Sequence, residues 1–114
     1  MKNTKELYLI LTKKWFLEIL KGVKKEEYRS FTEYYIERLG ELDKDGELID
    51  TRKYETIKFQ LGYRKNAPQM IVECKDVLIE VDEGDVEELN DQNSNFVIVL
   101  GEILEKINCE SLNI

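Results

Sequence analysis

The alternation of apolar and polar side chains in residues 70–81 constrains the fold more than any other feature of the chain. Apolar residues recur at every second position, first on even and then on odd numbers: Met70, Val72, Cys74, Val77, Ile79 and Val81. A period of two is typical of a strand, and the change of phase at Lys75-Asp76 indicates a β-bulge or bend. Because a bend lets a sheet curve toward closure, the segment predicts a small, curved sheet.

Other segments supply the remaining strands. Residues 7–11 and 96–100 are nearly continuous apolar runs, which predict strands covered on both faces. Residues 54–63 alternate as a half-buried strand does, and a further strand is expected to begin near Glu26. We therefore predict an α+β fold: a small curved, largely antiparallel β-barrel of five or six strands, with one helix after the first strand and a short helix after the second.

Capping residues and apolar spacing predict the two helices. Thr12 is the expected N-cap of a helix over residues 13–21, and Gly22 is expected to end it in the left-handed conformation. The apolar residues of this helix have the spacing of one buried stripe: Trp15, Phe16, Ile19 and Leu20. Thr32 is the expected N-cap of the second helix, which would end at Gly40 after about two turns.

The length of 114 residues predicts a single domain, 1–114, with an ordinary hydrophobic core. Flexible loops are expected at about 41–52 and 82–95, and a loose C-terminal tail at about 108–114. The acidic spacing of the first loop invites comparison with a calcium-binding loop. Arg52, however, occupies the twelfth position, where such a loop needs a bidentate glutamate, so we interpret the segment as a plain turn.

The composition gives no support for a metal site. The chain has no histidine, and its two cysteines, Cys74 and Cys109, are 35 positions apart. They form neither a zinc motif nor a CxxC redox pair, so we expect no metal, no cofactor and reduced thiols. No segment approaches the roughly 20 apolar residues of a membrane span, and the amino terminus lacks the apolar stretch of a signal peptide. We therefore expect a cytoplasmic protein without a membrane partner.

Charge is distributed unevenly along the chain, whose formal net charge is −7. Residues 1–29 carry eight basic against four acidic side chains, whereas residues 76–114 carry one against eleven. The total argues against a broad surface that coats nucleic acid. A local cationic cleft can nevertheless act, because charges are screened beyond about 8 Å at physiological salt.

The candidate site lies in residues 22–29, between the first helix and the following strand. Glu27 and Arg29 are expected to project from one face of that strand, with Lys24 in the preceding turn leaning toward Glu27. Tyr63 and Arg64, at the end of a later strand, are further candidates for contact with a ligand. A ligand, a substrate or a structural ion pair would each explain this group of charges.

The pattern Gly22-x-Lys24-x-x-Glu27-x-Arg29 resembles the signature of the ASCH domain family, which has a PUA-like barrel fold. The order of the elements resembles the small single-domain bacterial and phage members over nearly the whole chain, including Phe59-Gln60-Leu61-Gly62-Tyr63 and the strand from Phe96 to Glu102. The resemblance implies a cleft at the end of the barrel, lined by the motif, that binds RNA or nucleotide-like ligands.

Some members of this family are amidohydrolases that remove the acyl group from acetylated cytidine with a lysine, a threonine and a glutamate. Lys24 matches that lysine, Glu27 stands where the threonine belongs, and Glu73 on a later strand is the match for the glutamate. A carboxylate beside a lysine favours the charged ammonium, which suits contact with phosphate or carbonyl oxygens better than base chemistry.

Three hypotheses follow from these residues. In the first, a binding module, Lys24 and Arg29 contact phosphate or carbonyl oxygens and Glu27 orients them. A tyrosine offers a stacking surface for a base: Tyr28, Tyr34, Tyr35 or Tyr63, the last beside Arg64. In the second, an amidohydrolase of modified nucleosides, Lys24, Glu27 and Glu73 form the catalytic group. In the third, Lys24, Glu27 and Arg29 are an ion-pair network that closes the end of the barrel.

Overall fold

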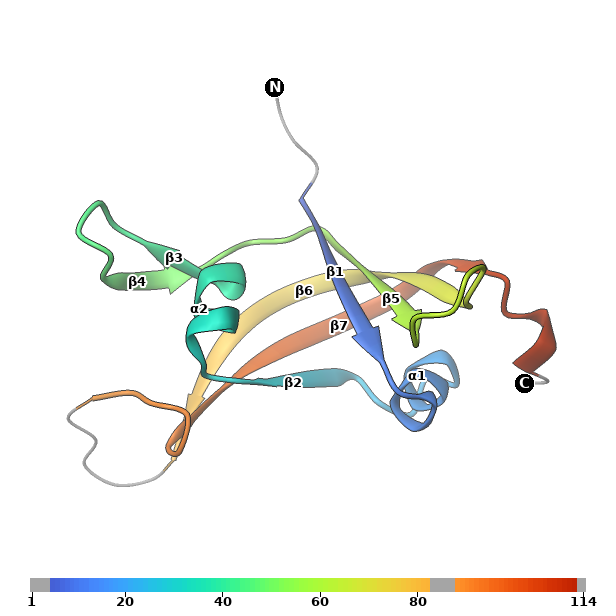
Figure 1. The fold of residues 1–114 in the computed structure, drawn as a ribbon, viewed down its shortest axis with the longest axis horizontal. Coiled ribbons are helices and arrows are strands. Elements are labelled where there is room, and N and C mark those ends of the chain that lie inside the picture. The colour runs from blue at the N-terminus through green and yellow to red at the C-terminus, as the bar shows by residue number, and fades with distance from the viewer. Residues whose placement is uncertain (1–4, 83–87, 113–114) are drawn as a thin grey trace.

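The computed structural model of this chain describes residues 5–82 and 88–112 (Figure 1). Within these residues the chain forms strands, two α-helices and a final 3₁₀ turn. In chain order the elements are β1 (Glu6–Leu11), α1 (Lys13–Leu20), β2 (Glu26–Ser30), α2 (Glu33–Leu39), β3 (Gly40–Leu42), β4 (Leu48–Thr51), β5 (Thr56–Leu61), β6 (Gln69–Val81), β7 (Ser94–Ile107) and η1 (Glu110–Leu112).

The main sheet contains five strands in the order β1-β5-β6-β7-β2. Strands β1 and β5 are parallel, and each of the other neighbouring pairs is antiparallel. The sheet curls into a half-barrel whose edges are β1 and β2, and Figure 1 shows the long β6–β7 pair running through the molecule. The predicted α+β class and the curved, largely antiparallel sheet are confirmed at this level.

The bend predicted in residues 70–81 is present in β6. The register between β6 and β7 shifts between Cys74 and Asp76, and two further irregularities lie between Ile71 and Cys74. Val72 and Val77 therefore both face the core although they differ in parity. The residues after Leu100 extend β7 to Ile107, so that β6 and β7 form one long bent ladder.

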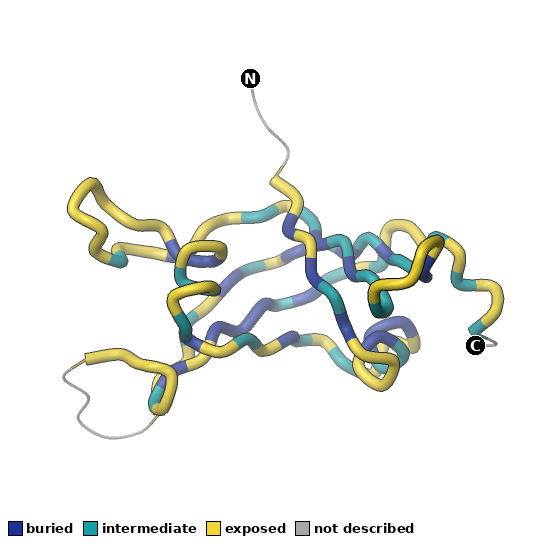
Figure 2. The backbone as a smooth tube through the Cα atoms, viewed as in Figure 1, coloured by how far each residue is buried: buried dark blue, intermediate teal, exposed yellow. Residues whose placement is uncertain are grey.

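The hydrophobic core fills the concave side of the half-barrel. Three phenylalanines from separate elements, Phe16, Phe59 and Phe96, are fully buried, and Figure 2 shows buried positions concentrated on the central strands and α1. Strand β1 differs from the prediction, because its Tyr8 is 45% exposed. As an edge strand of a half-barrel, β1 has one covered face and one face toward solvent, and only its odd-numbered residues are fully buried.

The segment 41–52, predicted as a flexible loop, is mostly an antiparallel hairpin of β3 and β4. Its turn is closed by the Asp43 carboxylate, which accepts hydrogen bonds from the backbone N–H groups of Asp45 and Glu47, both at 2.9 Å. The Thr51 hydroxyl donates to the Val77 carbonyl at 2.6 Å and so ties the hairpin to β6. Backbone and side-chain hydrogen bonds hold these strands, which is why apolar periodicity did not predict them.

Helix ends match the predictions only in part. Gly22 follows α1 with φ +79°, as expected for a left-handed terminator, and the Thr32 side chain accepts a hydrogen bond from Tyr35 N–H at 3.4 Å. Thr12 makes no side-chain cap bond. Gly40 is extended, with φ −98°, because β3 begins there directly.

Two predicted segments fall partly outside the described residues. In the predicted loop 82–95, residues 83–87 lie outside them, and Ser94 and Asn95 belong to β7. In the predicted tail 108–114, Glu110–Leu112 form the 3₁₀ turn η1, and residues 113–114 lie outside. Over the ranges 5–82 and 88–112, neither helix has the length and apolar character that a membrane crossing requires.

Candidate functional site

The connection between α1 and β2 fixes the position of Lys24. Gly22 reverses the chain at the end of α1, and the backbone N–H groups of Val23 and Lys24 then both donate to the Glu18 carbonyl, at 2.9 and 3.0 Å. These bonds satisfy a carbonyl of the last helical turn and hold the connection against the helix. Lys24 therefore enters β2 from a fixed backbone position.

Glu27 is the centre of the charged group. It is only 6% exposed, and the Arg29 guanidinium contacts its Oε2 atom through Nη2 at 2.8 Å and through Nε at 3.1 Å. The Lys24 Nζ atom lies 3.7 Å from the other oxygen, Oε1. Two cations thus compensate one buried carboxylate, which would otherwise be costly to remove from water.

Arg29 links both edges of the half-barrel. Its Nη1 atom donates to the Tyr35 hydroxyl at 2.8 Å, and its Nη2 atom donates to the Ile10 carbonyl of β1 at 3.2 Å. The side chain belongs to β2, so its guanidinium crosses the opening between the two edge strands. The predicted convergence of Lys24, Glu27 and Arg29 is present, and Tyr35 and Ile10 join it.

Lys24 lies between two aromatic rings: Tyr28, which the sequence offers as a stacking residue, and Trp15, which it does not place at the site. Its Nζ atom is 4.6 Å from the centroid of Trp15 and 5.2 Å from that of Tyr28. Both distances are within the range of cation–π attraction. Trp15 is 41% and Tyr28 48% exposed, and the Lys14 Nζ atom also lies 4.6 Å from the Trp15 centroid.

The prediction that Trp15 belongs to the buried stripe of α1 is wrong. At 100° per residue, the predicted stripe spans about 140° from Trp15 to Leu20, and Trp15 is at its margin. Phe16, Ile19 and Leu20 are buried, whereas Trp15 turns outward toward Lys14 and Lys24. Leu20, at the opposite margin, is buried, so the angle alone does not separate the two residues.

Glu73 lies on the other face of the sheet from Glu27. It alternates with the buried residues Val72 and Cys74, and its Oε1 atom accepts a hydrogen bond from the backbone N–H of Glu102 at 3.3 Å. Gly101 gives this carboxylate its space, since a Cβ atom there would collide with it. Between described residues, no hydrogen bond or ion pair joins Glu73 to Lys24 or Glu27.

Tyr63 and Arg64 are also apart from the charged group. They lie in the connection after β5, where Gly62 N–H donates to the Leu11 carbonyl at 3.1 Å. Tyr63 is 87% exposed. None of the hydrogen bonds and ion pairs between described residues joins either of them to Lys24, Glu27 or Arg29.

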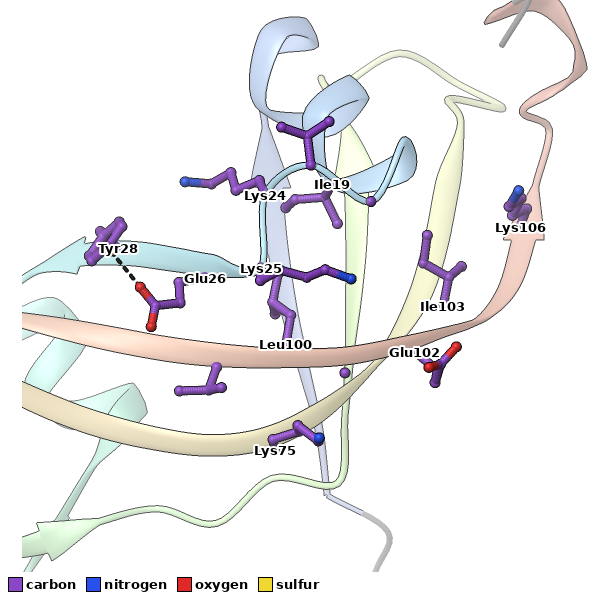
Figure 3. Close-up of a pocket in the computed structure, with 14 residues that line it drawn as sticks. Ile19, Lys24, Lys25, Glu26, Tyr28, Lys75, Leu100, Glu102, Ile103 and Lys106 are labelled. Carbon is purple, nitrogen blue, oxygen red and sulfur yellow. Dashed lines mark hydrogen bonds between the residues drawn. The ribbon is translucent and has the colours of Figure 1, made fainter.

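A cavity of about 860 Å³ adjoins the Lys24 side chain (Figure 3). Lys24 and Tyr28 form one end of its wall, and the Tyr28 hydroxyl donates to the Glu26 carboxylate at 2.6 Å. This hydrogen bond, followed by desolvation and the charges of Glu26 and Glu80, raises the pKa of Tyr28 above its ordinary value of 10.0. The phenol therefore remains a neutral donor at physiological pH.

Over the described residues, no cluster of three or more His, Cys, Asp or Glu side chains has the arrangement to hold a metal ion. Cys74 and Cys109 are free thiols. Burial raises the pKa of the Cys74 thiol, which makes it a poor nucleophile. The chemistry available at the site is therefore that of an ammonium, a carboxylate and aromatic rings.

Comparison with known proteins gave no match, whether with protein-family models, with curated proteins or with solved structures.

Proposed function

We propose that this chain binds RNA or a nucleotide-like ligand at the Lys24 site, which consists of Lys24, Trp15 and Tyr28 above the buried Glu27–Arg29 pair. The observation that carries the proposal is the Lys24 ammonium between two half-exposed aromatic rings. A base stacks on such rings, and the ammonium donates to a phosphate or carbonyl oxygen beside it. The resemblance of residues 22–29 to the ASCH signature and the curled half-barrel are compatible with the same proposal, which includes a PUA-like fold and a cytoplasmic location.

Glu27 and Arg29 have different roles from Lys24 in this proposal. The Arg29 donors are directed to Glu27, Tyr35 and Ile10, so Arg29 positions the carboxylate instead of contacting the ligand. Glu27 in turn holds the Lys24 ammonium at 3.7 Å. An ammonium has three donor hydrogens, and this single long contact leaves capacity for a ligand.

Hydrolysis of an acylated nucleoside receives less support from the same geometry. Glu27 is engaged by two cations, and Glu73 is on the opposite face of the sheet. The structural hypothesis has an observation of its own, since Arg29 bridges the edge strands β1 and β2. That role is compatible with ligand binding, because it uses Arg29 and leaves one side of Lys24 open.

Intrinsic fluorescence tests the proposal directly, because Trp15 is the one tryptophan in the sequence. Titration with nucleoside monophosphates and with short single-stranded RNA should change its emission. Lys24→Ala should weaken binding at least about tenfold, since hydrogen bonds to charged groups contribute about 1.5–3 kcal/mol. Calorimetric titration provides a readout that is independent of the fluorophore.

Lys44→Ala is the matched control, because Lys44 is an exposed lysine in the β3–β4 turn and its removal changes the net charge equally. Binding that is equal in the Lys24→Ala and Lys44→Ala variants would refute the proposal. Release of the acyl group from acylated nucleosides, abolished by Glu27→Gln, would replace it with the hydrolytic hypothesis.

A further inference from the structure

The cavity beside the Lys24 site has an unusual charge for this protein. We call it the lysine groove and define it by three exposed lysines from separate elements: Lys25 from the α1–β2 connection, Lys75 from β6 and Lys106 from β7. Its wall also includes Glu26 and Glu102, so its basic residues, together with Lys24, outnumber its acidic ones by four to two. The chain as a whole has a net charge of −7.

The lysines of the groove are not used to stabilise the fold. None of the ion pairs between residues 5–82 and 88–112 includes Lys25, Lys75 or Lys106. Among the described basic residues only Lys24, Arg29 and Lys53 form ion pairs, so what distinguishes Lys25, Lys75 and Lys106 is that they surround one cavity. Like charges gathered at one concave surface repel each other, and a bound anion relieves that repulsion.

The lysine groove extends from the Lys24 site along the sheet. In Figure 3, Lys25 extends across the cavity toward Ile103, whereas Lys24 points to the side on which Tyr28 lies. The floor of the groove consists of the apolar residues Val99, Leu100 and Gly101 of β7. The cavity therefore has Lys24 and Tyr28 at one end and the ammonium groups of other elements beyond them (Figure 3).

We propose that the lysine groove binds the sugar-phosphate backbone of a single-stranded oligonucleotide whose terminal base occupies the Lys24 site. This inference rests on the proposed function and specifies its ligand as an oligonucleotide instead of a free nucleoside or nucleotide. Stacking at Trp15 and Tyr28 engages one base, and the phosphates that follow it reach Lys25, Lys75 and Lys106.

The test compares a nucleoside monophosphate with a six-nucleotide single-stranded RNA that carries the same terminal nucleotide. Three added phosphate contacts give a slope of log affinity against log salt of about −2, at about 0.7 per contact. Between 50 and 200 mM salt, the affinity for the hexanucleotide should fall roughly fifteenfold more than the affinity for the monophosphate. The triple variant Lys25→Ala, Lys75→Ala, Lys106→Ala should remove this difference and leave binding of the monophosphate unchanged.

A second triple variant, Lys5→Ala, Lys13→Ala, Lys44→Ala, serves as the matched control. These lysines are exposed, do not line the groove and give the same change of net charge. The control variant should keep the parent affinity and salt slope for the hexanucleotide. Thermal unfolding of both variants identifies any loss of affinity that results from a less stable fold. Replacing exposed lysines should not lower the stability of the fold.

The outcomes separate the two proposals. A monophosphate that binds as tightly as the hexanucleotide, with the same salt slope, overturns the lysine groove and leaves the Lys24 site intact. Absence of binding by either ligand overturns both. Equal affinity for the hexanucleotide and for inorganic polyphosphate of the same charge also overturns the oligonucleotide assignment, because polyphosphate has no base to stack.

Discussion

Lys24 and Arg29 contact the same carboxylate, but their surroundings give them different capacities. Arg29 has three protein acceptors, Glu27, Tyr35 and Ile10, and its side chain is 16% exposed. The Lys24 side chain is similarly buried, with 15% of its surface exposed. Its polar contacts, however, are one 3.7 Å ion pair with Glu27 and the faces of two aromatic rings. The arginine is therefore a fixed structural cation and the lysine is the cation with donors to offer a ligand.

Tyr28 allows a prediction from its pKa. Glu26→Gln should lower the Tyr28 pKa toward the ordinary 10.0, because the hydrogen bond to Glu26 is the largest cause of its rise. A raised pKa means that the folded protein holds the phenolic proton more tightly than the unfolded chain. The stability from this contact is thus fully present below the unfolded pKa of about 10 and is lost as pH rises through the folded pKa.

Tyrosinate absorbance during alkaline titration checks this prediction. Tyr28→Phe identifies the contribution of Tyr28, and Glu26→Gln should move that contribution to lower pH. Glu18→Gln, at a partly exposed position of α1, is the control that removes one negative charge without a hydrogen bond to this phenol. Coinciding curves for the parent and Glu26→Gln proteins would contradict the assignment.

At the scale of elements, Gly40 joins helix α2 to strand β3 without a loop. The sequence predicts it as a left-handed terminator, but its φ is −98°, a value open to any residue. Its small size is what the junction requires. A Cβ atom there would lie 2.7 Å from the backbone oxygen of Ile36 and 2.6 Å from Leu48 Cδ1.

Gly40→Ala should therefore destabilise the protein by about 1–3 kcal/mol, the usual cost of overpacking a filled site. Urea unfolding measures the change in the free energy of unfolding. Glu41→Ala, at the exposed neighbouring position in β3, should change it by less than about 0.5 kcal/mol. Equal changes in the free energy of unfolding for the two substitutions would show that the junction tolerates a Cβ atom at position 40.

At the scale of the whole molecule, the half-barrel has two edge strands that no backbone ladder joins in the described residues. The Arg29 guanidinium spans this opening, from β2 to the Ile10 carbonyl of β1 and to Tyr35 of α2. One side chain thus connects the ends of a sheet that is otherwise open. Because Arg29 reaches β1 across the concave side of the sheet, its ion pair with Glu27 is buried there.

Arg29→Lys should keep the pairing with Glu27 and lose the contacts with Tyr35 and Ile10, because a lysine lacks the planar fork of donors. We expect a loss of about 2 kcal/mol in unfolding free energy. Hydrogen exchange should become faster in β1 and β2 and stay slow in the central β6–β7 ladder. Arg38→Lys is the control, since Arg38 is exposed and stacks on Tyr34. Unchanged protection of β1 would argue against a closing role for Arg29.

Much of the fold could be predicted because it depends on local pattern. The phase change at Lys75-Asp76 predicted the register shift in β6, and Gly22 predicted the left-handed end of α1. The spacing of Lys24, Glu27 and Arg29 predicted their contact, since alternation along one short strand is enough to place two of them together. These features need no knowledge of distant residues.

Other features could not be predicted, because contacts between distant segments decide them. The hairpin of β3 and β4 depends on its bond to Val77, and the solvent exposure of β1 depends on its place at the edge of the sheet. The position of Glu73 depends on which face of β6 the core covers. In each case, the sequence is compatible with two arrangements of the segment, and contacts with distant residues decide which one forms.

The sequence by itself determined where this chain bends, where its first helix ends and that three charged residues meet after Gly22. Only the tertiary structure decided that Glu27 faces inward while Tyr28 faces out, and that Trp15 turns from the expected core stripe to Lys24. The physical reason is that periodicity reports which residues share a face. Which face becomes buried depends on the free energy of the complete assembly of strands and helices.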